Sequence, residues 1–148
     1  MQLKKITDQA FRCVLYLSGC QRPRSSETIG KEAFVPEQNV KKIMSTLCKR
    51  GIVCRFYGKN SGYALAVSPE KIFPYDIVVL FEESCCVNRC LEEDKYCDRN
   101  GPESGCPVRL FLSDIQQQMN YQLKAVSFLE LYEQTDAYKE KSAKQITL

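Results

Sequence analysis

At 148 residues, with 44% hydrophobic and 26% charged residues, the chain is long enough for one domain of ordinary size and too short for a second, enzyme-sized unit. It contains no histidine, which excludes Ser-His-Asp and Cys-His catalysis, Cys-His zinc sites and proton transfer through imidazole. The net charge is only +3, but residues 1–59 hold twelve Lys/Arg against four Asp/Glu, whereas residues 60–148 hold nine against fourteen. This asymmetry predicts a polyanion-binding first half and a second half with another task.

Nine cysteines occur in a chain without a visible secretion signal. The first residues, MQLKKITDQAF, lack the apolar run of a signal peptide, and no apolar stretch approaches the roughly 20 residues that cross a bilayer. We therefore expect a cytoplasmic protein with no membrane partner. Because cytosolic thiols are kept reduced, the cysteines indicate metal or redox chemistry rather than a disulfide framework. Cys13, Cys48 and Cys54 are interpreted as small packing residues.

Three helices are expected in the first 50 residues. The first can be capped by Thr7 or Asp8 and ends at Gly19. A short second helix, SETIGKEAF, has Ser25 and Ser26 as candidate caps. Val and Pro at positions 35 and 36 mark a turn into the third helix.

The third helix, residues 36–50, has the sharpest pattern in the chain. One face is apolar and consists of Val40, Ile43, Met44 and Leu47. The opposite face is polar and consists of Gln38, Lys42, Ser45 and Lys49. Such hydrogen-bonding and cationic groups can enter a DNA major groove, although a merely solvated helix face can have the same composition.

Two strand-like runs follow the third helix, IVCRFY at 52–57 and YALAV at 63–67, with the turn GKNSG between them. Helix, turn, helix and a hairpin wing form the pattern of a winged helix-turn-helix domain. Residues 36–59 carry six Lys/Arg and only Glu37 in opposition, which favours DNA binding over a solvated face. The candidate DNA contacts are Gln38, Asn39, Lys42, Ser45, Lys49, Arg55, Lys59 and Asn60.

A cysteine-rich loop occupies the middle of the second half. It contains Cys85, Cys86, Cys90, Cys97 and Cys106, separated by Asp, Glu, Asn, Gly and Pro. This composition cannot pack a core, so something other than apolar burial must order the loop. The thiols could hold an iron-sulfur cluster, or zinc on Cys86, Cys90, Cys97 and Cys106. A thiol-disulfide sensor using Cys85, Cys86 or Cys90 is a third possibility.

The remaining elements are helical. A helix of about residues 75–83 precedes the loop, and a long amphipathic helix runs from Pro107 to about Ala125. Its apolar stripe consists of Val108, Phe111, Leu112, Ile115, Met119 and Leu123, with Leu110 and Tyr121 on the other side. Two apolar flanks predict one contact with the helix's own domain and one with a second subunit. Ser127 and Glu130 form a candidate capping box for a last short helix, and a polar tail starts at Gln134.

The order of five segments carries a family resemblance: MQLKKITDQAFRCVLYL, VKKIMSTLCKRGIV, GKNSGYALA, PYDIVVLFEE and a three-cysteine loop before a long helix. Over residues 1–133 the chain resembles the Rrf family of winged-helix transcription regulators, especially its NsrR-like and IscR-like iron-sulfur members. The resemblance implies a homodimer that binds a palindromic double-stranded DNA operator. It also implies a transcription repressor that senses redox state, nitric oxide or iron-sulfur status.

The resemblance further implies a ligand set. Cys90, Cys97 and Cys106 of one subunit would hold the cluster, with 4Fe-4S favoured over 2Fe-2S. In NsrR-like proteins an aspartate of the partner chain, in a Thr-Asp pair, is the fourth ligand, and Thr7-Asp8 matches that pair. IscR-like proteins use a histidine shortly after the third cysteine, where this chain has Arg109. The NsrR-like arrangement is therefore favoured, with Cys85 and Cys86 as alternative ligands.

The chain departs from the family in its wing, where Tyr57 replaces the usual Arg before the first glycine and Ser61 replaces one of two paired glycines. The expected fold is mainly α with a small β-hairpin wing. It comprises a winged helix-turn-helix DNA-binding domain (1–83), a cysteine-rich cluster-binding loop (84–106), a dimerisation helix with a short terminal helix (107–133) and a flexible tail (134–148).

Two other functions stay open. The chain could be a zinc-stabilised or thiol-based winged-helix regulator without a cluster, or a small iron-sulfur redox protein. Because it has neither a Gly-rich nucleotide loop nor a second cofactor motif, we expect no enzymatic activity.

Overall fold

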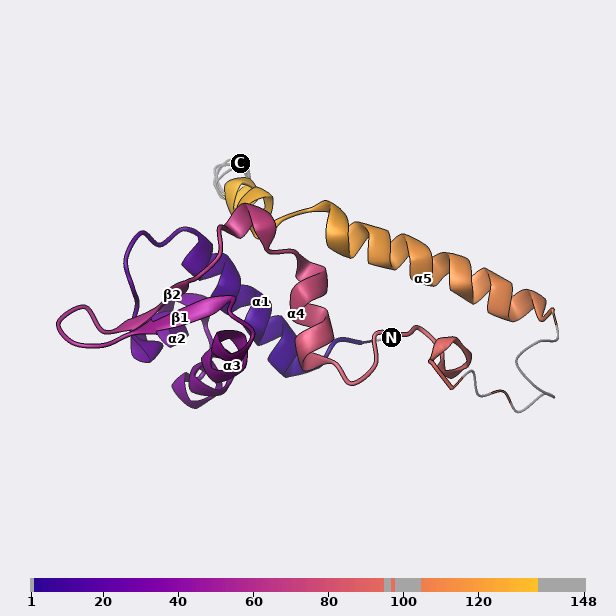
Figure 1. Cartoon of the computed structure of the whole chain (residues 1–148), viewed down its shortest axis with the longest axis horizontal. Coiled ribbons are helices and arrows are strands. Elements are labelled where there is room, and N and C mark those ends of the chain that lie inside the picture. Colours follow the sequence, from indigo (N-terminus) through magenta and orange to yellow (C-terminus); the bar gives the residue numbers. More distant parts are fainter. Residues whose placement is uncertain (1, 95–96, 98–104, 136–148) are drawn as a thin grey trace, which may run out of the picture.

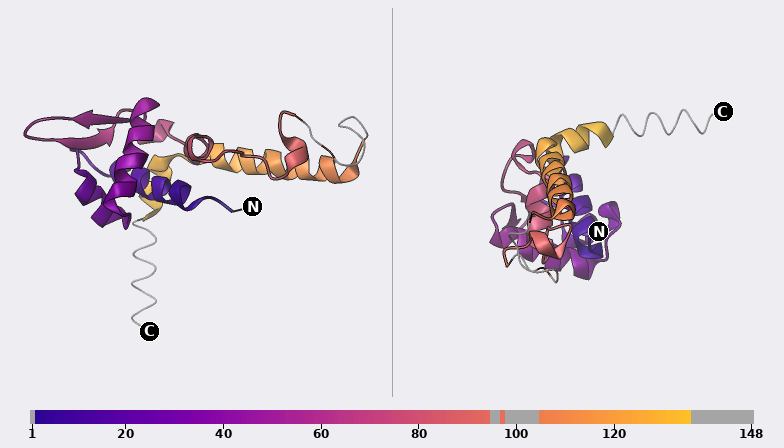
Figure 2. Two further views of the ribbon diagram at one scale, coloured as in Figure 1. Left: turned by 90° about the horizontal axis from the view of Figure 1, so that it is seen from below. Right: turned by 90° about the vertical axis from the view of Figure 1, so that its right-hand side faces the viewer.

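The computed structural model describes residues 2–94, 97 and 105–135. In chain order it contains α1 (Lys5–Ser18), α2 (Ser26–Ala33), α3 (Glu37–Lys49), β1 (Val53–Phe56), β2 (Gly62–Leu65), α4 (Pro74–Phe81) and α5 (Pro107–Ala125). Short 3-10 turns lie at Pro69–Lys71 and Arg89–Leu91. A last helical segment, called here the terminal helix, spans 128–135. The first three helices and the hairpin form a winged unit, and α5 extends away from it (Figures 1 and 2). The predicted mainly helical, winged fold is confirmed.

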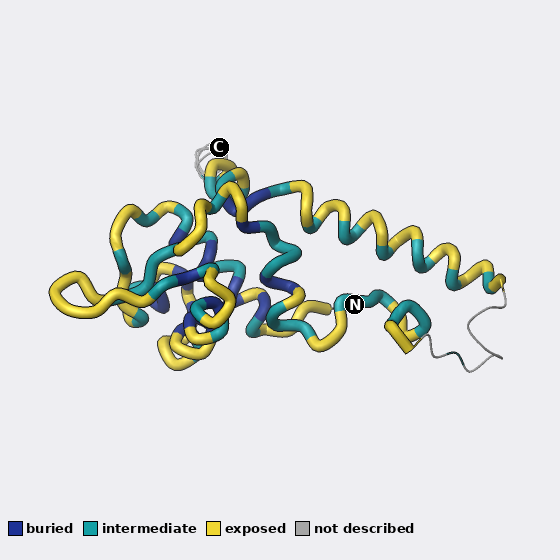
Figure 3. The backbone as a smooth tube through the Cα atoms, in the orientation of Figure 1, coloured by how far each residue is buried: buried dark blue, intermediate teal, exposed yellow. Residues whose placement is uncertain are grey.

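The core lies between α1, α2 and α3, where Figure 3 shows most of the buried backbone. The predicted apolar face of α3 is fully buried, since Val40, Ile43, Met44 and Leu47 are each 0% exposed. On α1 the buried apolar residues are Ala10, Cys13, Val14 and Leu17. The prediction of packing residues is confirmed for Cys13, which lies in the core, and for Cys48, which is partly buried against it, whereas Cys54 is half-buried.

The start of α1 differs from the prediction. The helix begins at Lys5 after the N-cap residue Lys4, so neither Thr7 nor Asp8 caps it. The cap comes instead from Glu82, the residue that follows α4, because its carboxylate accepts from the Lys4 backbone N–H at 2.8 Å and from the buried Thr7 hydroxyl. A carboxylate at this position accepts a hydrogen bond from a backbone N–H at the start of the helix. Its negative charge also interacts favourably with the positive end of the helix dipole. Local pattern could not show it, because the two residues lie 78 positions apart.

The second helix and the hairpin follow the predicted order. Ser25 caps α2 by accepting from the Thr28 backbone N–H at 3.1 Å. The strands β1 and β2 pair antiparallel, with Arg55 opposite Tyr63. The loop before α2 adds a third strand position, because Arg24 and Tyr63 exchange backbone hydrogen bonds of 2.9 and 2.8 Å. Gly62 permits this approach, since a Cβ there would lie 2.4 Å from the Arg24 carbonyl oxygen.

The second half leaves the winged unit and returns to it. The boundaries of α5 agree with the prediction, but none of its residues is buried. The predicted capping box is confirmed, because Glu130 accepts from the Ser127 backbone N–H at 2.7 Å and the Ser127 hydroxyl accepts from the Glu130 N–H. Phe128 is 1% exposed and its ring lies 6.2 Å from that of Phe11, so the terminal helix completes the core.

The predicted tail starts too early, because residues 134 and 135 are still helical. The remainder of that predicted tail lies outside the described residues. Within the described ranges, no helix combines the length and apolarity needed to cross a membrane.

Candidate functional site

The polar face of α3 is the first part of the candidate site. Gln38, Lys42, Ser45 and Lys49 are all exposed, directly opposite the buried apolar face. Because the core fixes that buried face, the helix presents these four side chains outward in a defined orientation. The hairpin packs against α3 and projects from the same unit (Figure 1).

Asn39 has a different role from its neighbours on α3. Its side-chain amide donates to the Gln9 amide oxygen on α1 at 3.0 Å, and Gln9 is only 2% exposed. A buried amide without a partner would cost stability, so the bond ties the first turn of α3 to α1. Asn39, predicted as a DNA contact, is half-buried in an internal contact. The role of Gln9 could not be predicted from the sequence, because a single polar residue in a helix is usually exposed to solvent.

Arg12 links α1 to the turn between α2 and α3. Its guanidinium pairs with Asp8 at 2.8 Å and donates to the Ala33 and Phe34 carbonyl oxygens at 3.3 and 2.9 Å. Phe34 has a φ of 55°, in the left-handed region that side chains rarely adopt. Arg12 therefore stabilises the turn at Ala33 and Phe34, which sets the direction of α3 relative to α2. Asp8, the predicted ligand, lies exposed on α1 within this ion pair.

The wing carries the other predicted DNA contacts. Lys59 and Asn60 are exposed in the turn between the strands. The Arg55 guanidinium lies over two aromatic rings, 5.1 Å from the centroid of Tyr57 and 5.7 Å from that of Tyr63. These cation-π contacts hold Arg55 in a fixed position on an exposed surface.

The Gln116 side chain ties the described part of the cysteine-rich loop (84–94, 97, 105 and 106, called here the cysteine segment) to α5. The Gln116 amide accepts from the Val87 backbone N–H at 2.7 Å and donates to the Cys85 carbonyl oxygen at 3.0 Å. The Cys86 thiol donates to the Leu91 carbonyl oxygen at 3.5 Å. The pKa of the Cys85 thiol is raised, first by burial and then by the charges of Cys86 and Glu82.

The predicted cluster ligands Cys90, Cys97 and Cys106 are all half-buried. Cys106 is the N-cap residue of α5, and the Cys90 sulfur lies 3.5 Å from the Asn88 amide nitrogen. Among the residues that the structure describes, no three Cys, Asp or Glu side chains come close enough together to hold a metal ion. The ligand set with Asp8 stays a prediction, as do the alternatives Cys85 and Cys86.

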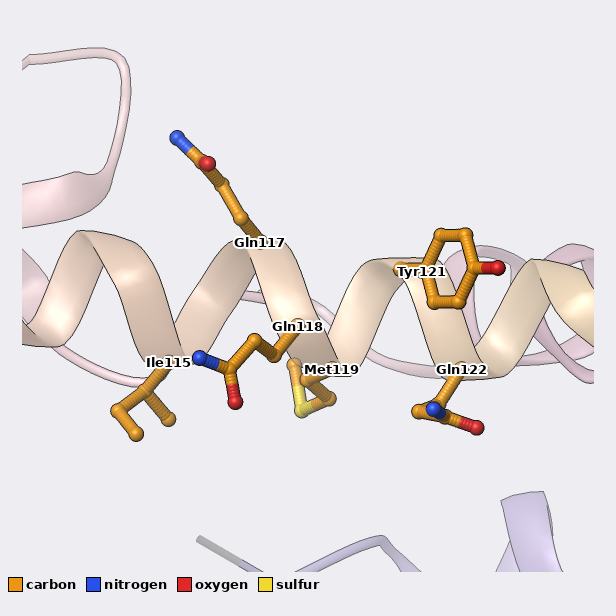
Figure 4. Close-up of a pocket in the computed structure, with 6 residues that line it drawn as sticks. All are labelled: Ile115, Gln117, Gln118, Met119, Tyr121 and Gln122. Atoms are coloured by element: carbon orange, nitrogen blue, oxygen red, sulfur yellow. The ribbon is translucent and has the colours of Figure 1, made fainter.

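The helix α5 exposes large apolar side chains on two flanks, that of Val108, Phe111 and Ile115 and that of Leu110 and Tyr121. Its exposed large side chains are Val108 (58%), Leu110 (65%), Phe111 (63%), Ile115 (39%) and Tyr121 (70%). Ile115 and Met119 point to one side of the helix and Gln117 points to the other (Figure 4), and all three are among the residues that line a depression of about 660 Å³. A soluble chain rarely exposes so many large apolar groups along one helix, so α5 is a candidate interface.

Sequence comparison identifies the family of this winged unit. Residues 3–134 match Rrf2, described as an iron-dependent transcriptional regulator. The chain belongs to the Rrf2 family. A protein of Aquifex aeolicus (strain VF5), assigned as an HTH-type transcriptional regulator, is 29% identical over 105 residues, which cover 71% of this chain and 72% of the relative. The chain is thus a DNA-binding transcription regulator of the Rrf2 family and not an enzyme.

Solved structures share the fold at low sequence identity. CymR (YrzC), the global cysteine regulator of B. subtilis, has a TM-score of 0.75 at 17% identity. The superposition covers 90% of this chain and 97% of the CymR chain. IscR of T. potens has a TM-score of 0.72 at 15% identity, and the superposition covers 91% of this chain and 88% of the IscR chain. The oxidized form of Staphylococcus aureus CymR has a TM-score of 0.68 at 19% identity, with 90% and 97% covered.

Proposed function

We propose that this Rrf2-family chain is a cytoplasmic, homodimeric repressor that binds operator DNA through α3 and the wing. We further propose that it responds to an iron-sulfur cluster held by its cysteine segment. The observation that carries the DNA-binding assignment is the exposed polar face of α3, which the buried opposite face orients beside a cationic hairpin.

Charge supports DNA as the partner. Lys42 and Lys49 lie on the exposed face of α3, and Lys59 lies in the wing turn. Cations on both elements can contact phosphates on either side of a groove, while Gln38 and Ser45 offer hydrogen bonds to base edges. Asn39 acts from inside, by fixing α3 to α1.

The donor chemistry of the cysteine segment fits an iron-sulfur cluster. Cys90, Cys97 and Cys106 are thiols from one segment, and thiolates are the usual ligands of such clusters. Cys106 stands at the N-terminus of the 19-residue helix α5, whose dipole favours a thiolate there. Asp8 of the partner subunit would be the fourth ligand. When bound, a 4Fe-4S cluster supplies a group that oxygen or nitric oxide can attack.

Two hydrogen-bonded links lead from the cysteine segment to α3 through α1. Glu82, three residues before Cys85, caps α1. Gln9 on α1 holds Asn39 on α3. A displacement of the cysteine segment would therefore reach the DNA-binding helix through α1, which is the coupling that a sensor requires.

The exposed apolar face of α5 supports the dimer. A second copy can cover this face with its own α5, which is the usual symmetric arrangement of homodimers. Two copies would then present two α3 helices, so that a palindromic operator could be bound.

Loss of cationic contacts tests the DNA-binding proposal. A duplex is first selected from a random-sequence library with the wild-type protein. Exchanging Lys42 and Lys49 together for Ala should weaken binding and reduce the magnitude of the slope of log K against log salt by about two, roughly one per phosphate contact. The control exchanges Lys5 and Lys71, which are also exposed, and removes the same charge. Equal affinities and slopes for the Lys42/Lys49 variant and the wild type would contradict the proposal.

A further inference from the structure

A cavity of about 470 Å³ lies between α1, the loop that follows it, the end of α2 and the terminal helix. Its volume is in the range of small-molecule sites in proteins. Tyr132 of the terminal helix packs directly on the backbone of Gly19, where a Cβ would overlap the tyrosine ring. Among the described residues that line the cavity, none belongs to the proposed ligand set or to the candidate DNA contacts.

Two side chains of opposite charge line this cavity. Arg24 comes from the loop after α1, and Glu32 comes from the end of α2. No ion pair within the described part of the chain joins the two. A simple anion would be repelled by Glu32 and a simple cation by Arg24. The pair therefore favours a ligand that carries both charges.

Arg24 is held in place before any ligand binds. Its backbone exchanges hydrogen bonds of 2.9 and 2.8 Å with Tyr63. The pKa of its guanidinium is raised, first by a hydrogen bond with the Cys20 side chain and then by the charge of the nearby Tyr16. A guanidinium that is positioned in this way loses little freedom when it binds a carboxylate, with which it can form two parallel hydrogen bonds.

One donor of a second arginine in the cavity wall lacks an acceptor. The Arg12 Nε–H is buried and has no hydrogen-bond partner among the described residues, although both terminal nitrogens are bonded. Buried donors without an acceptor are rare in proteins. A ligand oxygen in the cavity that Arg12 lines can supply one. Leu15 and the rings of Tyr16 and Tyr132 also line the cavity, so part of the ligand should be apolar.

The cavity borders the turn that sets the direction of α3. Ala33 and Phe34 line it, and Arg12 donates to the carbonyl oxygens of both. Phe34 is 83% exposed and has a φ of 55°, so its backbone is strained. An occupant of the cavity would contact this turn and change its stability, and with it the position of α3.

We propose that this cavity binds a small zwitterion of the α-amino-acid type, whose carboxylate pairs with Arg24 and whose ammonium group pairs with Glu32. The ligand's side chain packs against Leu15 and Tyr132. Its binding changes the affinity for operator DNA through the turn at Phe34, so the ligand is an effector. This effector role rests on the proposed DNA-binding function, whereas the binding site itself does not.

The test of binding titrates the full-length protein, without DNA, with each of the twenty standard L-amino acids in a calorimeter. At least one should bind, and Arg24→Gln and Glu32→Gln should each weaken its binding about tenfold. The N-acetyl and amide derivatives of that amino acid should also bind weakly, because each lacks one of the two charges. Arg22→Gln and Glu27→Gln are the matched controls, since both residues are exposed and neither lines the cavity.

Binding of none of the amino acids would overturn the inference, as would binding that Arg24→Gln and Glu32→Gln leave unchanged. Filter binding with the selected duplex tests the effector role. The bound amino acid should change duplex affinity about fivefold or more, and Glu32→Gln should require about ten times more of it for half of that change. Unchanged duplex affinity would refute the effector role. If the wild type selects no duplex, the proposed function fails and the effector role with it, while calorimetry decides the binding site separately.

Discussion

Among the nine cysteines, Cys13 differs from the others because it is buried completely. Burial raises the pKa of its thiol to about 12 from the usual 9.0, against the opposing charge of Arg12. The folded state therefore disfavours the thiolate more than the unfolded state does. The buried, protonated Cys13 thiol therefore contributes stability that is fully present below pH 9.0. This contribution is lost as the pH rises through about 12, where the folded protein also loses the proton.

We predict that Cys13→Ala flattens the alkaline part of the stability curve. Above pH 9.0 the wild-type free energy of unfolding should fall by up to about 1.4 kcal/mol per pH unit from this thiol. The alanine variant is less stable at neutral pH because it leaves a small cavity, but it lacks this contribution to the slope. Urea unfolding at a series of pH values measures the difference, with Cys20→Ala as control. Parallel curves for Cys13→Ala and the wild type would contradict the argument.

At the residue scale, sequence pattern found exposed groups better than internal polar ones. The exposed face of α3 was predictable because apolar residues recur at helical spacing on the opposite face. These residues, Val40, Ile43, Met44 and Leu47, are all buried. Gln9, Arg12 and Glu82 were not predictable, because each acts through a partner on another element. Such contacts depend on how helices pack, which no local spacing records.

At the scale of the element, α1 depends on a cap from Glu82, the residue that follows α4. The Glu82 carboxylate is the acceptor for the Lys4 backbone N–H and the Thr7 hydroxyl, and Thr7 is 0% exposed. Removal of the carboxylate leaves a buried hydroxyl without an acceptor in the described structure. This is one of the costliest kinds of polar loss in a protein.

We predict that Glu82→Ala lowers the free energy of unfolding by about 0.5–2 kcal/mol, the usual range for a lost helix cap. Glu82→Gln should cost less, since its amide oxygen can still accept. Thr7→Val should cost little in the Glu82→Ala background, because the hydroxyl has already lost its acceptor. A double-mutant cycle by chemical unfolding measures this coupling. Additive effects of the two changes would show that the contact does not stabilise α1.

The ends of elements were predicted less well than their existence. Both boundaries of α5 were predicted correctly, because Pro107 and the apolar period mark them clearly. The first helix started earlier than its expected caps, because its true cap is distant in sequence. The last helix extended further into the polar tail than composition indicated, because Phe128 anchors its start in the core.

At the scale of the whole molecule, the winged unit has its own core while α5 has no buried residue. A long helix with several exposed large apolar groups is not stable in isolation, since most helical stability comes from packing. The proposed dimer supplies that packing.

We predict that Ile115→Glu shifts the protein from dimer to monomer, because a carboxylate would have to be buried without a partner at the interface. Gln21→Glu is the matched control, since Gln21 is exposed in the loop after α1, away from α5, and the change introduces the same charge. Size-exclusion chromatography with light scattering measures both. A dimeric Ile115→Glu variant would mean that another surface holds the subunits together.

The most direct test of the sensing proposal is the metal and sulfide content of protein purified without oxygen. We predict a brown wild-type protein with iron and acid-labile sulfide in comparable amounts, and colourless Cys90→Ala, Cys97→Ala and Cys106→Ala variants. Cys48→Ala should keep its colour, because Cys48 lies on α3 and outside the proposed ligand set. Colourless wild-type protein with stoichiometric zinc, or with no metal and reactive thiols, would contradict the proposal and identify a zinc-stabilised or thiol-based regulator instead.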